Sequence, residues 1–175
     1  MRKLKNSELE RISVDNFKNS KKTPIIVVLD NVRSALNVGS AFRTSDAFRI
    51  EKIYLCGITS TPPNKEIRKS ALGSTNSVEW EHAEKTDEVV LKLRKEGYLV
   101  CAIEQVSNSV MLNNFKSTEK PLVVVFGNEV NGVQQSVVDL CDVCIEIPQI
   151  GTKHSLNISV SIGVVLWDLF YKVNQ

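Results

Sequence analysis

The sequence predicts an α/β domain whose sheet is mostly parallel and carries helices on both faces. Four short apolar runs, at residues 25–29, 53–56, 99–103 and 122–126, are typical of strands that are buried on both faces. Helical patterns separate these runs, as they do in folds whose consecutive strands are parallel. In such sheets, ligands bind beyond the carboxyl ends of the strands.

Length and composition indicate one soluble domain. The chain has 175 residues, of which 42% are hydrophobic and 24% charged, and its formal net charge is +2. We expect a basic N-terminal helix or arm at residues 1–23 and one domain at residues 24–175. Lys18, Lys21 and Lys22 make this arm a candidate for contact with a phosphate backbone, although a solvated terminus explains the charge equally well.

We expect a cytoplasmic protein without a membrane segment. No apolar region of the kind found in signal peptides follows the basic N-terminus. The most apolar segment, residues 156–171, is interrupted by Asn157, Ser159 and Asp168 and is shorter than the roughly 20 apolar residues that span a bilayer. It is therefore interpreted as a core helix.

In the first half of the chain, a short helix is expected at residues 7–17, because Ser7 and Glu10 have the spacing of a capping box. The strand at 25–29 ends in a polar loop at 31–38, where Asn37 is placed to cap the next helix. The other expected elements of this half are a helix at 39–48, the strand at 53–56, a helix at 65–72 and a strand at 77–80.

In the second half, Thr86 is placed to cap an amphipathic helix that Gly97 ends. The strands at 99–103 and 122–126 follow. The remaining expected elements are a helix at 134–140, a strand at 143–147 and a long buried helix that begins at Ser155.

Three strands end in polar loops that contain glycine, and we expect these loops to converge. The first loop carries Asn37 and Gly39, and Arg43 lies about one turn into the helix that follows. An amide, free backbone N–H groups and a guanidinium together suit a phosphate group. Taken alone, the same residues describe a capped helix with a surface arginine.

The second loop, residues 127–132, holds Glu129 between two glycines. An ordinary strand-to-helix turn also explains this pattern. The third loop, residues 148–155, leads into a helix with Ser155 and Asn157 at its start. Because these two residues are two positions apart, one is expected to cap the helix while the other faces the cleft.

Several other residues suggest chemistry only weakly. His154 beside the third loop is interpreted as a bystander. Cys141 and Cys144 form a C-x-x-C pair just before a strand, without the further ligands that zinc needs, so they are interpreted as structural, with a redox role as the alternative. No metal site is expected. The first strand is not followed by G-x-G-x-x-G, and the sequence has no G-x-x-x-x-G-K-[ST], the two glycine-rich motifs that bind nucleotide phosphates. A nucleotide-like ligand must therefore be held without a loop that binds a polyphosphate.

Taken in order, the three loops resemble motifs 1, 2 and 3 of the SpoU (TrmH-like) branch of the SPOUT methyltransferases. Residues 37–43 (N-x-G-x-x-x-R) are similar to motif 1, residues 122–132 (LVVVFGNEVNG) to motif 2 and residues 147–163 (IPQIGTKHSLNISVSIG) to motif 3. The resemblance runs from about Pro24 to the C-terminus. Gln149 departs from it, since the family usually has methionine there.

The resemblance implies a C-terminal trefoil knot, S-adenosylmethionine as cofactor and a homodimer that packs partly through the last helix. It also implies methylation of a ribose 2′-hydroxyl in tRNA or rRNA. The cofactor-binding residues that it implies are Ile103, Glu104, Gln105, Gly127, Asn128, Gly132, Ile147, Gln149 and Leu156.

In the family mechanism, the arginine that matches Arg43 is the base that takes the proton of the ribose hydroxyl. Because the pKa of arginine lies above about 12, clamping the adjacent phosphate is an equally good role for Arg43. Asn37, Glu129, Ser155 and Asn157 would position Arg43 and the RNA, some of them from the second subunit. The expected RNA-binding residues are Lys18, Lys21, Lys22, Arg33, Lys65, Arg68 and Lys69.

Two other functions stay open at the level of sequence. A non-catalytic RNA-binding relative is expected to lose motif 1, yet Asn37 and Arg43 are both present. Another α/β enzyme that uses a nucleotide, such as a Rossmann oxidoreductase, is disfavoured by the missing glycine fingerprint.

Overall fold

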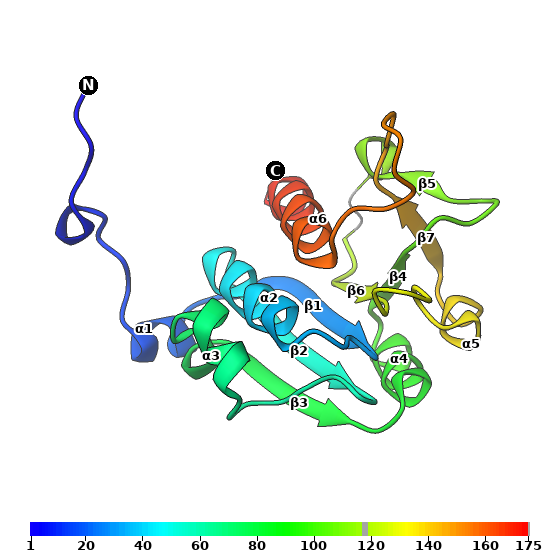
Figure 1. Ribbon diagram of the computed structural model, residues 1–175, viewed down its shortest axis with the longest axis horizontal. Helices are drawn as coiled ribbons and strands as arrows, with labels where there is room; N and C mark the ends of the chain where they lie inside the picture. The colour runs from blue at the N-terminus through cyan, green and yellow to red at the C-terminus, as the bar shows by residue number, and fades with distance from the viewer. Residues whose placement is uncertain (117–118, 175) are drawn as a thin grey trace.

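The computed structural model describes residues 1–116 and 119–174, and its centre is a seven-stranded sheet (Figure 1). The strand order is β3-β2-β1-β6-β4-β7-β5, and within the described residues every pairing between neighbouring strands is parallel. The predicted fold class is therefore confirmed, whereas the trefoil knot stays a prediction. The strands are β1 (Thr23–Asp30), β2 (Ile50–Cys56), β3 (Glu79–Ala83), β4 (Leu99–Ile103), β5 (Val110–Met111), β6 (Leu122–Phe126) and β7 (Val143–Glu146).

Helices cover both faces of the sheet because successive strand residues point to opposite sides. In β1, Ile25, Val27 and Leu29 enter one core cluster, and Ile26 and Val28 enter the other. The first cluster is covered by α2 (Ala35–Ala47), α3 (Lys65–Ala71) and α6 (Ile158–Val173), which lie together in Figure 1. The second cluster is covered by α4 (Thr86–Lys95) and α5 (Gln135–Val138).

The order of the strands brings distant loops to one edge of the sheet. Strand β6 lies between β1 and β4, with Leu29 opposite Phe126, and β7 lies on the other side of β4. Because all these strands are parallel, the segments that follow β1, β4, β6 and β7 leave from the same edge. The expected convergence of the three loops is thereby explained.

The helix expected at residues 7–17 is wrong. The segment forms a 3₁₀ turn, η1 (Asn6–Glu8), and a separate helix, α1 (Val14–Asn19), whose N-cap is Ser13. The apolar side chains of Leu9 and Ile12 are exposed, and only Phe17 of α1 is buried. A continuous helix here would bury no apolar face against the domain, so it would lack the packing energy that stabilises most helices in proteins.

Two expected helix caps are also wrong. Helix α2 begins at residue 35, because the Ser34 side chain accepts a hydrogen bond from the backbone N of Asn37 at 3.3 Å. Helix α4 has Lys85 as its N-cap, and the Thr86 hydroxyl instead donates to Asp30. At α6, one of Ser155 and Asn157 was expected to cap the helix, and the Asn157 side chain does so by accepting from the backbone N of Ser159 at 2.9 Å. The helix begins at Ile158, three residues later than expected.

The remaining differences concern the ends of elements and very short elements. Strand β2 begins three residues earlier than expected, β3 is displaced toward the C-terminus, and α5 and β7 are shorter than expected. Strand β5 and the 3₁₀ turns η2 (Ser74–Asn76) and η3 (Leu112–Asn114) were not expected from the sequence.

Candidate active site

A cavity of about 530 Å³ lies at the carboxyl ends of β4, β6 and β7. Residues from all three of these strand ends and from the start of α6 line it, which fits the general rule for parallel sheets. The structure therefore brings together all nine residues expected to bind a cofactor and three of the five expected catalytic residues. The lining residues from those two sets are Ile103, Glu104, Gln105, Gly127, Asn128, Gly132, Ile147, Gln149, Leu156, Glu129, Ser155 and Asn157.

Glu129 joins the first loop to the second. Its carboxylate accepts hydrogen bonds from the backbone N of Arg33 at 2.9 Å, the backbone N of Ser34 at 3.0 Å and the side-chain amide of Asn37 at 3.0 Å. Partial burial acts to raise the pKa of Glu129, but these donors outweigh it and hold the pKa below its ordinary value. The ionised carboxylate is thus a fixed clamp at the mouth of the cavity.

The second loop is closed on itself. Asn128 and Gly132 exchange backbone hydrogen bonds of 2.9 Å in both directions, and the Asn128 side-chain amide donates to the backbone O of Asn31 at 2.8 Å. A Cβ atom at Gly127 would lie 2.0 Å from the backbone C of Gly132 and the backbone N of Val133. Glycine is therefore required at position 127 by the close approach of the loop's own backbone.

Glu104 and Gln105 connect the end of β4 to the two loops beside it. The Glu104 carboxylate accepts from the backbone N of Val133 and from the backbone N of Gln105, each at 3.0 Å. The Gln105 side chain donates to the backbone O of His154 at 2.7 Å. His154 thus contributes a backbone group to the site, while its imidazole has no assigned role.

Arg43 does not reach the cavity that Glu129 and Asn157 line. Its exposed side chain borders a second cavity, of about 730 Å³, between α2 and α6. Ile147 lines both cavities, so the two are neighbours. Within one copy of the chain, Glu129, Ser155 and Asn157 therefore line the first cavity and Arg43 borders the second. Asn37 lines neither cavity, but its side-chain amide donates to Glu129.

Residues 24–167 match the family model described as the SpoU rRNA Methylase family. The match covers well over half of the chain, including all three loops. The chain belongs to the SpoU rRNA methylase family. The resemblance inferred from the three motifs is thereby confirmed.

Individual SpoU relatives agree with this assignment. A tRNA (guanosine(18)-2′-O)-methyltransferase of Aquifex aeolicus is 33% identical over 149 residues, which cover 82% of this chain and 67% of the relative. The crystal structure of an A. aeolicus TrmH/SpoU tRNA modifying enzyme has a TM-score of 0.82 at 27% identity, over 92% of this chain and 81% of the other. An AdoMet-bound rRNA methyltransferase from Sinorhizobium meliloti has a TM-score of 0.78 at 29% identity, over 85% of this chain and 56% of the other.

The chain spans 56% to 67% of the length of three curated SpoU relatives that it matches.

Three side-chain contacts beside the SpoU cavity were not predicted from the sequence. Asp30 binds the end of the second loop, Thr86 donates to Asp30, and Ser34 caps α2. The signal for Ser34 was its position three residues before Asn37, which is the spacing of an N-cap and its bonding partner. Asp30 carries a weaker signal, as an acidic residue that directly ends a strand buried on both faces.

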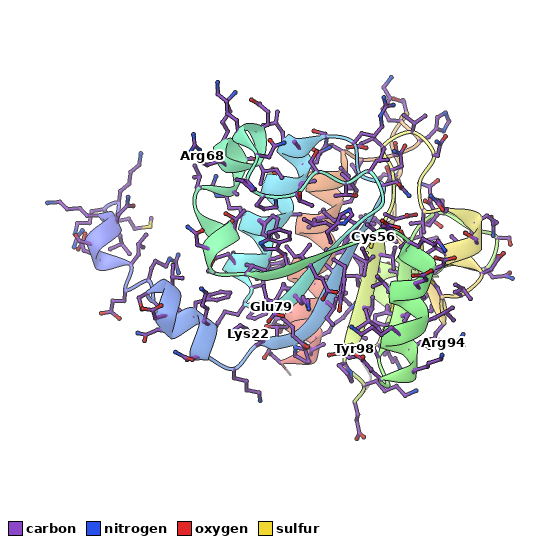
Figure 2. The ribbon with its side chains drawn as sticks, turned by 90° about the horizontal axis from the view of Figure 1, so that it is seen from below. Lys22, Cys56, Arg68, Glu79, Arg94 and Tyr98 are labelled. Carbon is purple, nitrogen blue, oxygen red and sulfur yellow. The ribbon has the colours of Figure 1, made fainter. Side chains whose placement is uncertain are left out.

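The expected RNA-binding residues lie outside the SpoU cavity. Lys18, Lys21, Arg33, Lys65, Arg68 and Lys69 are exposed. Figure 2 shows Arg68 projecting from α3 and Lys22 at the amino-terminal end of the sheet, away from Cys56 at the carboxyl end of β2. Lys22 differs from the others because its ammonium already donates to the backbone O atoms of Phe17, Lys18 and Ser20. This contact makes Lys22 a cap for the end of α1.

The cysteines of the SpoU domain are free thiols among the described residues. Burial raises the pKa of Cys141 to about 12 and raises the pKa of Cys144. A raised pKa leaves little of the reactive thiolate, which favours the structural interpretation over the redox one. Among the described residues, no three His, Cys, Asp or Glu side chains form a group suited to a metal ion.

Within residues 1–116 and 119–174, none of the helices has the length and apolar character that crossing a bilayer requires.

Proposed function

We propose that this chain is an S-adenosylmethionine-dependent RNA methyltransferase that modifies a ribose 2′-hydroxyl in tRNA or rRNA. The observation that carries the proposal is that the loops of motifs 2 and 3 line one cavity, and that Glu129 of motif 2 binds Asn37 of motif 1 beside it. The names of the relatives support the substrate class. Such an enzyme would act in the cytoplasm, where tRNA and rRNA are modified.

The chemistry of the cavity suits S-adenosylmethionine. Its lining includes the carboxylates of Glu104, Glu129 and Glu146, and the lining residues include no lysine, arginine or histidine. An acidic cavity favours a ligand that carries a sulfonium and an ammonium group, and it disfavours the polyphosphate of a dinucleotide. The volume of about 530 Å³ lies in the usual range for a cofactor site.

Apolar side chains and free backbone groups provide the rest of the proposed binding site. Ile103, Ile147 and Leu156 offer apolar walls for an adenine ring. Within the described part of the chain, the backbone groups of Gln149 and Leu156 make no hydrogen bonds, so they are available to a ligand. Bound S-adenosylmethionine would supply a methyl group that is already activated, which leaves alignment and proton removal to the protein.

Arg43 would act on the RNA from the neighbouring cavity. Its guanidinium is exposed and has no hydrogen-bond partner among the described residues, so it is available to a phosphate group. We propose that Arg43 clamps the phosphate next to the reacting ribose and stabilises the charge that develops on the 2′-oxygen. The other expected catalytic residues would keep the two cavities in a fixed relative position and would position the RNA backbone. They are Asn37, Glu129, Ser155 and Asn157.

We propose that the working unit is a homodimer. Four apolar side chains at helical spacing on α6 are exposed in the single chain, and two of them, Val164 and Trp167, border the cavity that Arg43 also lines. Trp167 is 61% exposed and Tyr171 60% exposed, and their rings stack with centroids 6.3 Å apart. Packing a second copy against this stripe would bury it and would enclose Arg43 beside the reacting ribose. The stripe consists of Val160, Val164, Trp167 and Tyr171.

The RNA would be held outside the cavity by exposed basic residues of the N-terminal arm, the first loop and α3. The candidates are Lys18, Lys21, Arg33, Lys65, Arg68 and Lys69. Lys69 also pairs with Glu66 at 2.7 Å, an exposed pair that is easily exchanged for a phosphate contact.

The proposed function is tested by the transfer of labelled methyl groups from S-adenosylmethionine to total tRNA and rRNA, followed by mapping of the labelled nucleosides. We expect label in 2′-O-methylated nucleosides, and we expect Arg43→Ala to reduce the transfer by at least about 100-fold. Calorimetry with S-adenosylmethionine and with NAD separates this function from that of another nucleotide-using enzyme. RNA binding without any transfer would instead support a non-catalytic RNA-binding relative.

A further inference from the structure

Asp30, the last residue of β1, is fully buried and belongs to none of the three family motifs. Its Oδ1 accepts hydrogen bonds from the Thr86 hydroxyl at 2.6 Å and from the Asn31 side-chain amide at 2.9 Å. Its Oδ2 accepts from the backbone N of Gln134 at 2.9 Å. A buried carboxylate is costly unless donors satisfy it, and here three donors surround it.

The hydrogen bond at Oδ2 connects Asp30 to the loop that lines the cavity. Gln134 is the N-cap of α5 and ends the segment at residues 127–134, which includes the loop part of motif 2. The start of that loop is fixed by the pairing of Phe126 with Leu29 of β1. Its end is fixed by the bond between Gln134 and Asp30. Both ends of the loop are therefore held by residues of β1, and the cavity lies along the segment between them.

We propose that Asp30 is a positioning residue for the cofactor cavity. By holding the end of the motif 2 loop against β1, Asp30 fixes the backbone of residues 128–132, which line the cavity. Asp30 is not itself a lining residue, so it acts only through the loop. The inference rests on the proposed function to the extent that the cavity is the site of S-adenosylmethionine.

The two oxygens of Asp30 allow its roles to be separated. Thr86→Val removes a donor to Oδ1 and leaves the bond from Gln134 to Oδ2 in place. Gln134→Pro removes the donor at Oδ2 and leaves Asp30 unchanged. The φ angle of Gln134 is −57°, which a proline ring also adopts. Asp30→Asn keeps one oxygen that can accept from Gln134, and it is the conservative variant.

The first test is hydrogen exchange in the protein without any ligand. In Asp30→Ala and in Gln134→Pro, we expect the amides of residues 128–133 to exchange at least about tenfold faster than in the wild type. The matched control is Thr23→Val, which removes a buried hydrogen bond of 2.6 Å to the backbone O of Phe48 at the other end of β1. Thr23→Val should lower stability without changing exchange in the loop. Wild-type exchange in both loop variants would overturn the proposal.

The second test is the Kd for S-adenosylmethionine, measured by calorimetry. We expect affinity to fall by about tenfold in Asp30→Ala and in Gln134→Pro, while Asp30→Asn, Thr86→Val and Thr23→Val stay within about threefold of the wild type. Unchanged affinity in Gln134→Pro would overturn the role of Asp30 in the cavity. If the wild type itself binds no S-adenosylmethionine, the proposed function fails, while the exchange experiment still decides whether Asp30 positions the loop.

Discussion

The side-chain amide of Asn37 donates a hydrogen bond of 3.0 Å to Glu129 Oε1, which joins two loops that lie 92 positions apart in the chain. The same oxygen accepts from the backbone N of Ser34, and Oε2 accepts from the backbone N of Arg33. One carboxylate therefore satisfies donors at the start of α2 and holds the first loop against the cavity. This arrangement makes the charge of Glu129 a structural requirement of the site.

Glu129→Gln is expected to loosen the site. The amide that replaces the carboxylate has one acceptor oxygen, so it cannot serve all three donors. We expect methyl transfer to fall by at least about tenfold and the free energy of unfolding to fall by about 1 kcal/mol. Glu84→Gln, a change at an exposed glutamate outside the cavity, is the matched control. Wild-type activity in Glu129→Gln would contradict this role.

The charge of Glu129 also predicts a dependence on pH. Because the fold lowers the pKa of Glu129 below 4.5, its contribution to stability is complete above that pH and is lost as the pH falls through the lower folded pKa. Urea denaturation at a series of pH values should show a constant difference between the wild type and Glu129→Gln from about pH 7 to about pH 5.5. Below about pH 4.5 the difference should shrink, and a difference that persists there would refute the assignment.

These contacts show why the convergence of the loops was predictable while their details were not. Continuous apolar strands that alternate with helices require the strand ends to share one edge, so Glu129 and Asn157 could be placed at one cavity from sequence. Which polar side chain caps a helix depends on competition for donors in space. Ser34 caps α2, whereas the Asn37 amide donates to Glu129 and the Thr86 hydroxyl donates to Asp30.

The position of Arg43 was not predictable for a related reason. Its place in the sequence puts it one turn into a helix, but the face of α2 on which it lies depends on how that helix packs against α6. Likewise, the spacing of Ser7 and Glu10 indicated a helix that has no partner surface to stabilise it. Local patterns predicted the elements with a large buried face and failed where that face is absent.

Lys22→Gln is expected to release the N-terminal arm. The Lys22 ammonium donates to three backbone carbonyl groups at the end of α1 and lies 4.8 Å from the centroid of the Phe17 ring. Without this contact, limited proteolysis should cut residues 1–22 faster than in the wild type. Lys21→Gln, at an exposed neighbour, is the control, and it should leave the cleavage rate unchanged.

Lys18→Gln and Lys21→Gln should instead weaken the binding of RNA. Each phosphate contact that is lost should reduce the slope of log Kd against log salt concentration by about 1. A filter-binding series over several salt concentrations measures this slope for each variant. Slopes that match the wild type in both variants would exclude the arm from the RNA interface.

Trp167→Arg is expected to produce a monomer if α6 packs against a second copy. The change places a charge in the centre of the exposed stripe formed by Val160, Val164, Trp167 and Tyr171. Leu91→Arg, at an apolar residue of α4 that is 40% exposed, is the matched control and should leave the mass unchanged. Light scattering after size-exclusion chromatography measures the mass of each variant. A Trp167→Arg protein with the same mass as the wild type would exclude this face from the interface.

Gly127→Ala is expected to abolish the cavity without affecting the rest of the domain. The added Cβ would lie 2.0 Å from the backbone C of Gly132 and the backbone N of Val133, so the loop must open to admit it. Because these are backbone atoms, no side-chain rotation can relieve the clash, and the affinity for S-adenosylmethionine should fall by at least about 100-fold. Gly151→Ala is the matched control, since no atom lies within 4 Å of its added Cβ. Calorimetry measures the affinity of both variants for S-adenosylmethionine, and circular dichroism confirms that each variant is folded. If Gly127→Ala binds S-adenosylmethionine as tightly as Gly151→Ala does, glycine is not required at position 127.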